Sequence, residues 1–144
     1  MIYLDKNIAV ITYNVDSTPP YDDILDTVAL DTAYKIHILL VFPKNKILCD
    51  QYREDNLYDM LNALVDANTT GRPIYVHLPN GVALPDKLKP FIMKRVTFIQ
   101  DKNAKKYRFG DIYLMRRKSG YYLRVSENTY TNPVNKWCKL HMDL

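Results

Sequence analysis

The sequence predicts an α/β protein: a three-layer body with a short parallel β-α-β-α-β core, extended by a C-terminal antiparallel β-hairpin. Two observations predict this class. Runs rich in β-branched and aromatic residues at 8–15, 36–42 and 74–78 are separated by two segments with helical periodicity. Strands that alternate with helices through short joins are typical of a parallel sheet with right-handed crossovers. A Tyr/Arg-rich segment at 107–125 follows another predicted strand at 95–100 and indicates the hairpin.

The first helix is predicted in the segment that follows residue 15. Asp16 or Thr18 is expected to cap it, and Pro19 suits its first turn. Asp22 and Asp23 complement the positive end of its dipole. The residues predicted for its inward stripe are Ile24, Leu25, Val28, Ala29 and Thr32.

The second helix has the clearest pattern in the chain. Asp50 is the predicted cap, and Gly71 and Pro73 end the helical segment before the strand at 74–78. The apolar residues predicted to face the core at helical spacing are Leu57, Met60, Leu61, Leu64 and Val65. The run "IHILLVF" at 36–42 is continuously hydrophobic, which predicts a strand covered on both faces.

The hairpin register is predicted from its turn. Ser119 and Gly120 suit a two-residue turn, because glycine readily takes the positive φ that such turns need. This register pairs Leu114 with Val125. It places four apolar residues on one face, namely Ile112, Leu114, Leu123 and Val125. The opposite face then carries Tyr113, Met115, Arg117, Tyr122, Arg124 and Ser126.

Length and charge predict one domain with two unlike halves. The 144 residues suit a single domain. Residues 1–85 carry six basic and eleven acidic side chains, a net charge of −5. Residues 86–144 carry fourteen basic and five acidic side chains, a net charge of +9, and include a polar tail. This division indicates that the C-terminal half faces an anionic partner, or that unlike halves of two molecules meet.

Several classes of protein and site are disfavoured. No apolar run approaches the roughly 20 residues that span a bilayer, and the N-terminus lacks a basic leader, so neither membrane association nor a signal peptide is expected. Cys49 and Cys138 are expected to be free thiols in a reducing cytoplasm. No metal site is expected, because the two cysteines and three histidines are scattered. No cofactor is expected, because no glycine-rich phosphate loop is present.

The Tyr/Arg-rich hairpin carries the leading functional hypothesis, a small non-enzymatic binding protein that contacts nucleic acid. Aromatic rings stack on bases of any sequence, and arginines hold phosphates. The residues predicted to bind are Tyr113, Arg117, Tyr122, Arg124, Lys102, Lys105, Lys106 and Arg108. The alternative is an assembly or inhibitor protein that docks on a protein partner through the same face. Richness in Tyr, Asn, Lys, Ile and Asp suits the AT-rich genes of a phage or mobile element.

A small enzyme is the third hypothesis. Ligands of open parallel sheets usually bind beyond the carboxyl ends of the strands. The polar residues predicted there are Asn14, Asp16, Thr18, Lys44, His77 and Asn80. The simpler interpretation is that these residues form turns and helix caps. It predicts that Asp16 and His77 do not share a pocket.

Overall fold

A computed structural model describes residues 2–5, 8–29, 35–100, 106–109, 112–118, 120–125 and 138–139. Within these ranges, side chains are described for 8–26, 35–100, 113–115, 118 and 122–124. The chain divides into two compact units, Met1–Gln100 and Asp101–His141, and each is described by itself. The single-domain organisation stays a prediction.

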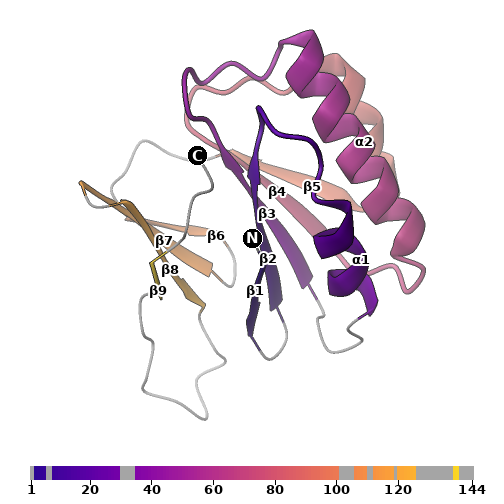
Figure 1. The fold of residues 1–144 in the computed structure, drawn as a ribbon, viewed down its shortest axis with the longest axis horizontal. Coiled ribbons are helices and arrows are strands. Elements are labelled where there is room, and N and C mark those ends of the chain that lie inside the picture. The colour runs from indigo at the N-terminus through magenta and orange to yellow at the C-terminus, as the bar shows by residue number, and fades with distance from the viewer. Residues whose placement is uncertain are drawn as a thin grey trace. The chain divides into compact units, whose positions relative to one another are not determined.

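The first unit contains a five-stranded sheet in the order β1-β2-β3-β4-β5 (Figure 1). β1 (Ile2–Asp5) is antiparallel to β2. The other four strands run parallel, and they are β2 (Ile8–Asn14), β3 (Lys35–Val41), β4 (Ile74–Leu78) and β5 (Val96–Gln100). The predicted α/β class and parallel core are therefore confirmed.

The helices of the first unit are α1 (Tyr21–Ala29), α2 (Gln51–Ala67) and the 3₁₀-helix η1 (Asp86–Lys94). They lie on the same side of the sheet (Figure 1). The described helices thus supply one covering layer of the predicted three-layer body. None of the helices in the described ranges is long and apolar enough to cross a membrane.

The main core lies between this helical layer and the sheet. Alternate residues of each parallel strand enter it, since successive side chains of a strand point to opposite faces. Its strand residues include Ile11, Ile38 and Val76. Its helix residues are Ile24 from α1, Leu57, Met60, Leu61 and Leu64 from α2, and Leu88 and Phe91 from η1.

The two predicted helices differ in how well the sequence anticipated them. In α2 four of the five predicted stripe residues are buried, and Val65 is partly buried against the same core. Asp50 caps the helix by accepting hydrogen bonds from the backbone N–H groups of Tyr52 and Arg53. In α1 Ile24 is buried as predicted, but Leu25 is 58% exposed. That part of the predicted stripe is wrong. The prediction assumed an apolar stripe wide enough to bury both Ile24 and Leu25, whereas α1 buries only Ile24.

The sheet face opposite the helices is also apolar and buried. It carries Val10 of β2, His37 and Leu39 of β3 and His77 of β4. Every residue of β3 from Ile36 to Val41 is buried, which confirms the predicted strand covered on both faces. His37 is a buried, hydrogen-bonded residue of this face.

The second unit contains a four-stranded antiparallel sheet in the order β6-β7-β8-β9. The predicted hairpin is β7 (Ile112–Arg117) and β8 (Gly120–Val125), and its existence is confirmed. Two short strands flank it, β6 (Lys106–Phe109) and β9 (Cys138–Lys139).

The predicted register of the hairpin is wrong by two residues. Leu114 pairs with Leu123, and Arg117 pairs with Gly120, so Gly120 belongs to the strand and Lys118 lies in the loop. The pairing keeps the two leucines opposite each other, and both are buried. Because the shift is even, it leaves the residues of β7 and β8 on their predicted faces, and the predicted Ser126 lies outside the described residues.

Candidate functional site

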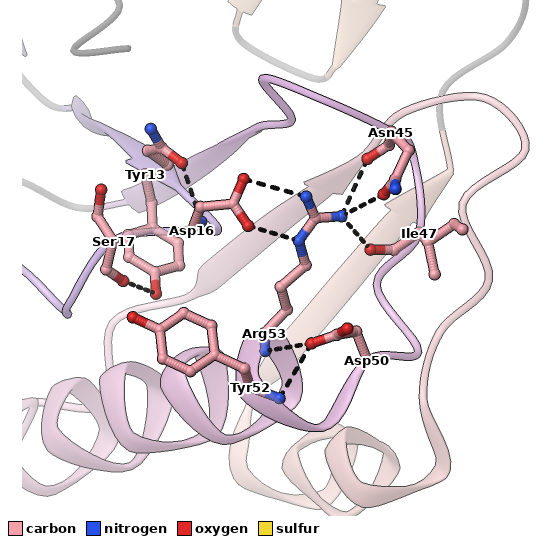
Figure 2. Close-up of polar contacts among 9 residues, drawn as sticks. Tyr13, Asp16, Ser17, Asn45, Ile47, Asp50, Tyr52 and Arg53 are labelled. Carbon is pink, nitrogen blue, oxygen red and sulfur yellow. Dashed lines mark hydrogen bonds and ion pairs between the residues drawn. The ribbon is translucent and has the colours of Figure 1, made fainter.

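A buried arginine organises the carboxyl ends of the first two parallel strands. Arg53, in the first turn of α2, donates from Nε to Asp16 Oδ1 at 2.8 Å and from Nη2 to Asp16 Oδ2 at 3.0 Å (Figure 2). Its Nη1 donates to Asn45 Oδ1 at 2.7 Å and to the carbonyl oxygens of Asn45 and Ile47 at 3.0 and 2.6 Å. One side chain thus ties α2 to the loops after β2 and β3.

The electrostatics of this pair follow from unequal burial. The Arg53 side chain is 6% exposed and that of Asp16 is 32% exposed. Hydrogen bonding from Arg53, with further attraction from Arg53 and Lys44, holds the pKa of Asp16 below its usual value. The Phe42 ring lies 5.7 Å from the Arg53 guanidinium carbon and covers it further. The cation is therefore held in place by carboxylate, carbonyls and ring together.

Sequence reasoning missed Arg53, although a signal was present. Arg53 precedes Leu57 by four residues, so it continues the apolar stripe of α2 into the first turn. A charged residue on a buried stripe needs a partner, because burial of an isolated charge is strongly unfavourable. The expectation that Asp16 or Thr18 caps α1 is wrong. Asp16 instead binds Arg53, and α1 begins only at Tyr21.

Two shallow cavities flank this cluster. One, of about 200 Å³, is lined by Asn14, Thr18 and other residues near the start of α1. The other, of about 310 Å³, is lined by Asp16, Arg53 and residues of the loop before α2. The strand order from β2 to β5 follows the sequence without reversal. The sheet therefore lacks the reversal in strand order at which doubly wound proteins open a ligand crevice.

The predicted strand-end residues separate into several places. Asn14 Oδ1 accepts from the Asp16 backbone N–H at 2.9 Å, so these two lie together. Lys44 and Asn80 are exposed in their loops, and Thr18 is exposed beside the first cavity. His77 lies on the opposite sheet face, where Nε2 is 2.8 Å from Nδ1 of His37. Among the described residues, no group of three or more His, Cys, Asp or Glu side chains is arranged to hold a metal ion.

The buried histidine pair predicts a dependence of stability on pH. Burial, and secondarily His37, lowers the pKa of His77 well below its usual 6.5. The unfolded chain then binds a proton more readily than the folded protein does. We expect the free energy of unfolding to be highest, as far as His77 is concerned, above about pH 6.5 and to fall as the pH drops below that value.

Chemical denaturation of the wild type and of His77→Gln between pH 7.5 and 5 measures this effect. The variant lacks the titrating imidazole, so its stability is expected to change less over that range. His141 is present in both proteins, whereas His37 loses its imidazole neighbour in the variant. Equal pH dependence of the two proteins would contradict the prediction.

The second candidate site is one face of the sheet β6–β9. Backbone pairing aligns Lys106, Met115, Tyr122 and Lys139 in one cross-strand row. Arg108, Tyr113 and Arg124 form the next row, and Arg117 stands opposite Gly120. Residues paired across an antiparallel sheet share a face. We name this set of eight positions the basic face: Lys106, Arg108, Tyr113, Met115, Arg117, Tyr122, Arg124 and Lys139.

Two described side chains of the basic face, Arg124 and Tyr113, are packed against each other. The guanidinium carbon of Arg124 lies 4.6 Å from the centre of the Tyr113 ring. Tyr113, Tyr122 and Arg124 are partly exposed, whereas Met115 between them is 4% exposed. Arg117, Lys106 and Arg108 are placed by backbone register, and the predicted Lys102 and Lys105 lie outside the described residues. The hairpin therefore presents flat, partly exposed rings next to a cation.

Comparisons with protein-family models, with curated proteins and with solved structures give no match. Two sites in the molecule bear on its function. At the strand ends, the most buried charge is already bound by Asp16, Asn45 and Ile47. That arrangement stabilises the loops that it joins. The basic face gathers cationic and aromatic residues, so it is the better candidate for binding.

Proposed function

We propose that the protein binds single-stranded nucleic acid through the basic face. One observation carries this proposal: the strand pairing brings five cationic positions and two tyrosines to the same face. None of the residues in β6, β7, β8 and β9 is acidic. Neighbouring strands lie about 4.8 Å apart, so four strands form a platform about 14 Å across. This platform is wide enough for a phosphate backbone with its bases turned toward the sheet.

The chemistry of the face suits bases that are unpaired. Stacking on Tyr113 and Tyr122 needs a base whose flat side is accessible, which a single strand offers and a duplex does not. The arginines and lysines then neutralise phosphates without reading sequence. Packing of Arg124 on Tyr113 orders both groups before the ligand arrives, which reduces the entropy lost on binding. The ligand class we propose is therefore single-stranded DNA or RNA with little sequence preference.

The cellular setting is part of the same proposal. A nucleic-acid ligand and an exposed free thiol at Cys49 both suit a reducing cytoplasm. The amino-acid composition suits the AT-rich genes of a phage or mobile element. No enzymatic step is proposed.

The double variant Arg117→Ala/Arg124→Ala is expected to bind a single-stranded oligonucleotide more weakly than the wild type. Each lost phosphate contact should also reduce the slope of log affinity against log salt by about 0.7. The matched control is Arg116→Ala/Lys118→Ala. It removes the same charge, but Arg116 lies on the other face and Lys118 in the loop. Fluorescence anisotropy over a series of salt concentrations measures both quantities.

Tyr122 tests the stacking part of the same proposal. Tyr122→Ala is expected to weaken binding by about 1–3 kcal/mol, with little dependence on salt, because stacking involves no net charge. Tyr122→Phe keeps the ring and should bind like the wild type. If the arginine variant and Tyr122→Ala both bind like the wild type at low salt, the proposal is wrong. Thermal unfolding of each variant shows that the fold is retained.

A further inference from the structure

A group of large side chains stands exposed at the end of the first unit where α1 and α2 begin. Four side chains there are each between 47% and 58% exposed. They are Tyr21 and Leu25 of α1, Ile47 of the loop before α2, and Tyr52 of α2. Ile47 and Tyr52 line the same cavity. Tyr21 and Tyr52 both lie close enough to act electrostatically on the Tyr13 hydroxyl. Figure 2 shows Tyr52 beside Tyr13. We name Tyr21, Leu25, Ile47 and Tyr52 the helix-end patch.

The helices that carry this patch are acidic. Neither α1 nor α2 contains a lysine, and their one arginine, Arg53, is bound to Asp16. Asp22 and Asp26 of α1 and Asp59 of α2 are exposed. Lys44 and Lys46 in the loop before Ile47 are also exposed, and Lys44 lies close enough to Asp16 to attract it electrostatically. Lys87 of η1 pairs with Asp55 of α2 and lies close enough to Asp59 to interact with it electrostatically. The cations near this end therefore lie in that loop and in η1, whereas the exposed charged residues of α1 and α2 are carboxylates.

Exposed rings within a charged rim are typical of protein-binding surfaces. Tyrosines are favoured hot-spot residues, and contiguous exposed apolar side chains on a small protein commonly mark interaction sites. An acidic rim selects a basic partner, since matched potentials steer association and like charges oppose it. The partner surface should therefore combine cations with flat or apolar side chains.

This chain carries such a surface itself. The basic face offers Arg117 and Arg124 beside Tyr113 and Tyr122, with no acidic residue in its four strands. The halves of the sequence differ correspondingly, with a net charge of −5 over residues 1–85 and +9 over 86–144. We propose that the helix-end patch of one molecule docks on the basic face of a second copy. The two surfaces are different, so the contact is head-to-tail and repeats along a row of molecules.

Complementary variants test this arrangement. Asp26→Lys/Asp59→Lys reverses the acidic rim but keeps the basic face. Neither carboxylate lies in the first turn of its helix, where a negative charge stabilises the helix. Arg117→Glu/Arg124→Glu reverses the basic face but keeps the acidic rim. Sedimentation velocity at low salt is expected to show concentration-dependent oligomers of the wild type and monomers of each variant alone.

The mixture of the two variants gives the decisive result. One intact acidic patch and one intact basic face remain between them, and the two reversed surfaces also carry opposite charges. The mixture should therefore associate again into dimers and longer rows. Asp66→Lys, in the last turn of α2, changes the charge about 21 Å along the helix from its first turn and should still oligomerise. High salt should dissociate the wild-type oligomers into monomers, because it screens the charges at the contact. A monomeric wild type at low salt, or a mixture that stays monomeric, would overturn the proposal.

The experiment separates this inference from the proposed function. Sedimentation is measured without nucleic acid, so its outcome does not depend on nucleic-acid binding. The Asp26→Lys/Asp59→Lys variant keeps its basic face and should still bind a single-stranded oligonucleotide. If it binds but the variant mixture stays monomeric, only self-association is wrong. If the mixture forms dimers but no protein binds the oligonucleotide, only the nucleic-acid proposal is wrong.

Discussion

Replacing Arg53 by alanine is expected to lower the free energy of unfolding by about 3–5 kcal/mol. The substitution removes a buried cation that donates hydrogen bonds to Asp16 and to two loop carbonyl oxygens. On folding, these acceptors exchange hydrogen bonds with water for hydrogen bonds from Arg53. These acceptors then lose their partner, and unsatisfied acceptors destabilise the folded state by more than the net worth of the original hydrogen bonds. Urea denaturation monitored by circular dichroism measures the change.

Two further variants show whether the paired geometry or the charge alone matters at this position. Arg53→Lys keeps the charge but cannot bind Asp16 through two parallel hydrogen bonds, so it should recover little stability. Asp16→Ala should destabilise less than Arg53→Ala, because the Asp16 side chain is 32% exposed and water can replace part of its contacts. Full stability in Arg53→Lys would show that the specific geometry of the pair contributes nothing.

The pair also predicts how stability changes in acid. The pKa of Asp16 is lower in the folded protein than in the unfolded chain, so Asp16 contributes stability above its unfolded pKa of about 3.9. That contribution is lost as the pH falls through the folded pKa. The histidine pair acts in a separate and higher range, so the two contributions can be measured apart.

Leu61→Ala is expected to destabilise the protein by about 2–5 kcal/mol, as for other leucines removed from a packed core. Leu61 is fully buried in α2 and belongs to the core between the helices and the sheet. Leu25→Ala is the matched control in α1. Leu25 is 58% exposed, so its loss should change stability by less than about 0.5 kcal/mol. Equal effects of the two substitutions would contradict the difference in burial between Leu61 and Leu25.

The sequence predicted elements well where the pattern was long and local. The 17 residues of α2 span several turns, so a cap and a repeating stripe both specify it. Continuous hydrophobicity likewise identified β3, because a strand buried on both faces leaves no polar position. The short strands β6 and β9, of four and two residues, are too brief to show a period.

The polar sites were harder to predict because their partners are distant in sequence. Asp16 looked like a helix cap, since the residues beside it start a helix, but its partner Arg53 lies 37 positions away. His77 looked like a strand-end residue, but alternation along β4 puts it on the face opposite the main core, beside His37. The hairpin faces were predicted correctly despite the wrong register, because apolar burial specifies parity more strongly than turn chemistry does.

The sequential order of the strands bears on how the first unit forms. Each strand of this sheet is hydrogen-bonded to the strand that precedes it in the chain, from β1 through β5. During synthesis, every new strand therefore meets a partner that has already left the ribosome. No early strand has to wait for a late one, and contacts between residues close in sequence generally speed folding. The nascent sheet can grow outward from β1 as translation proceeds, with each strand pairing soon after it emerges.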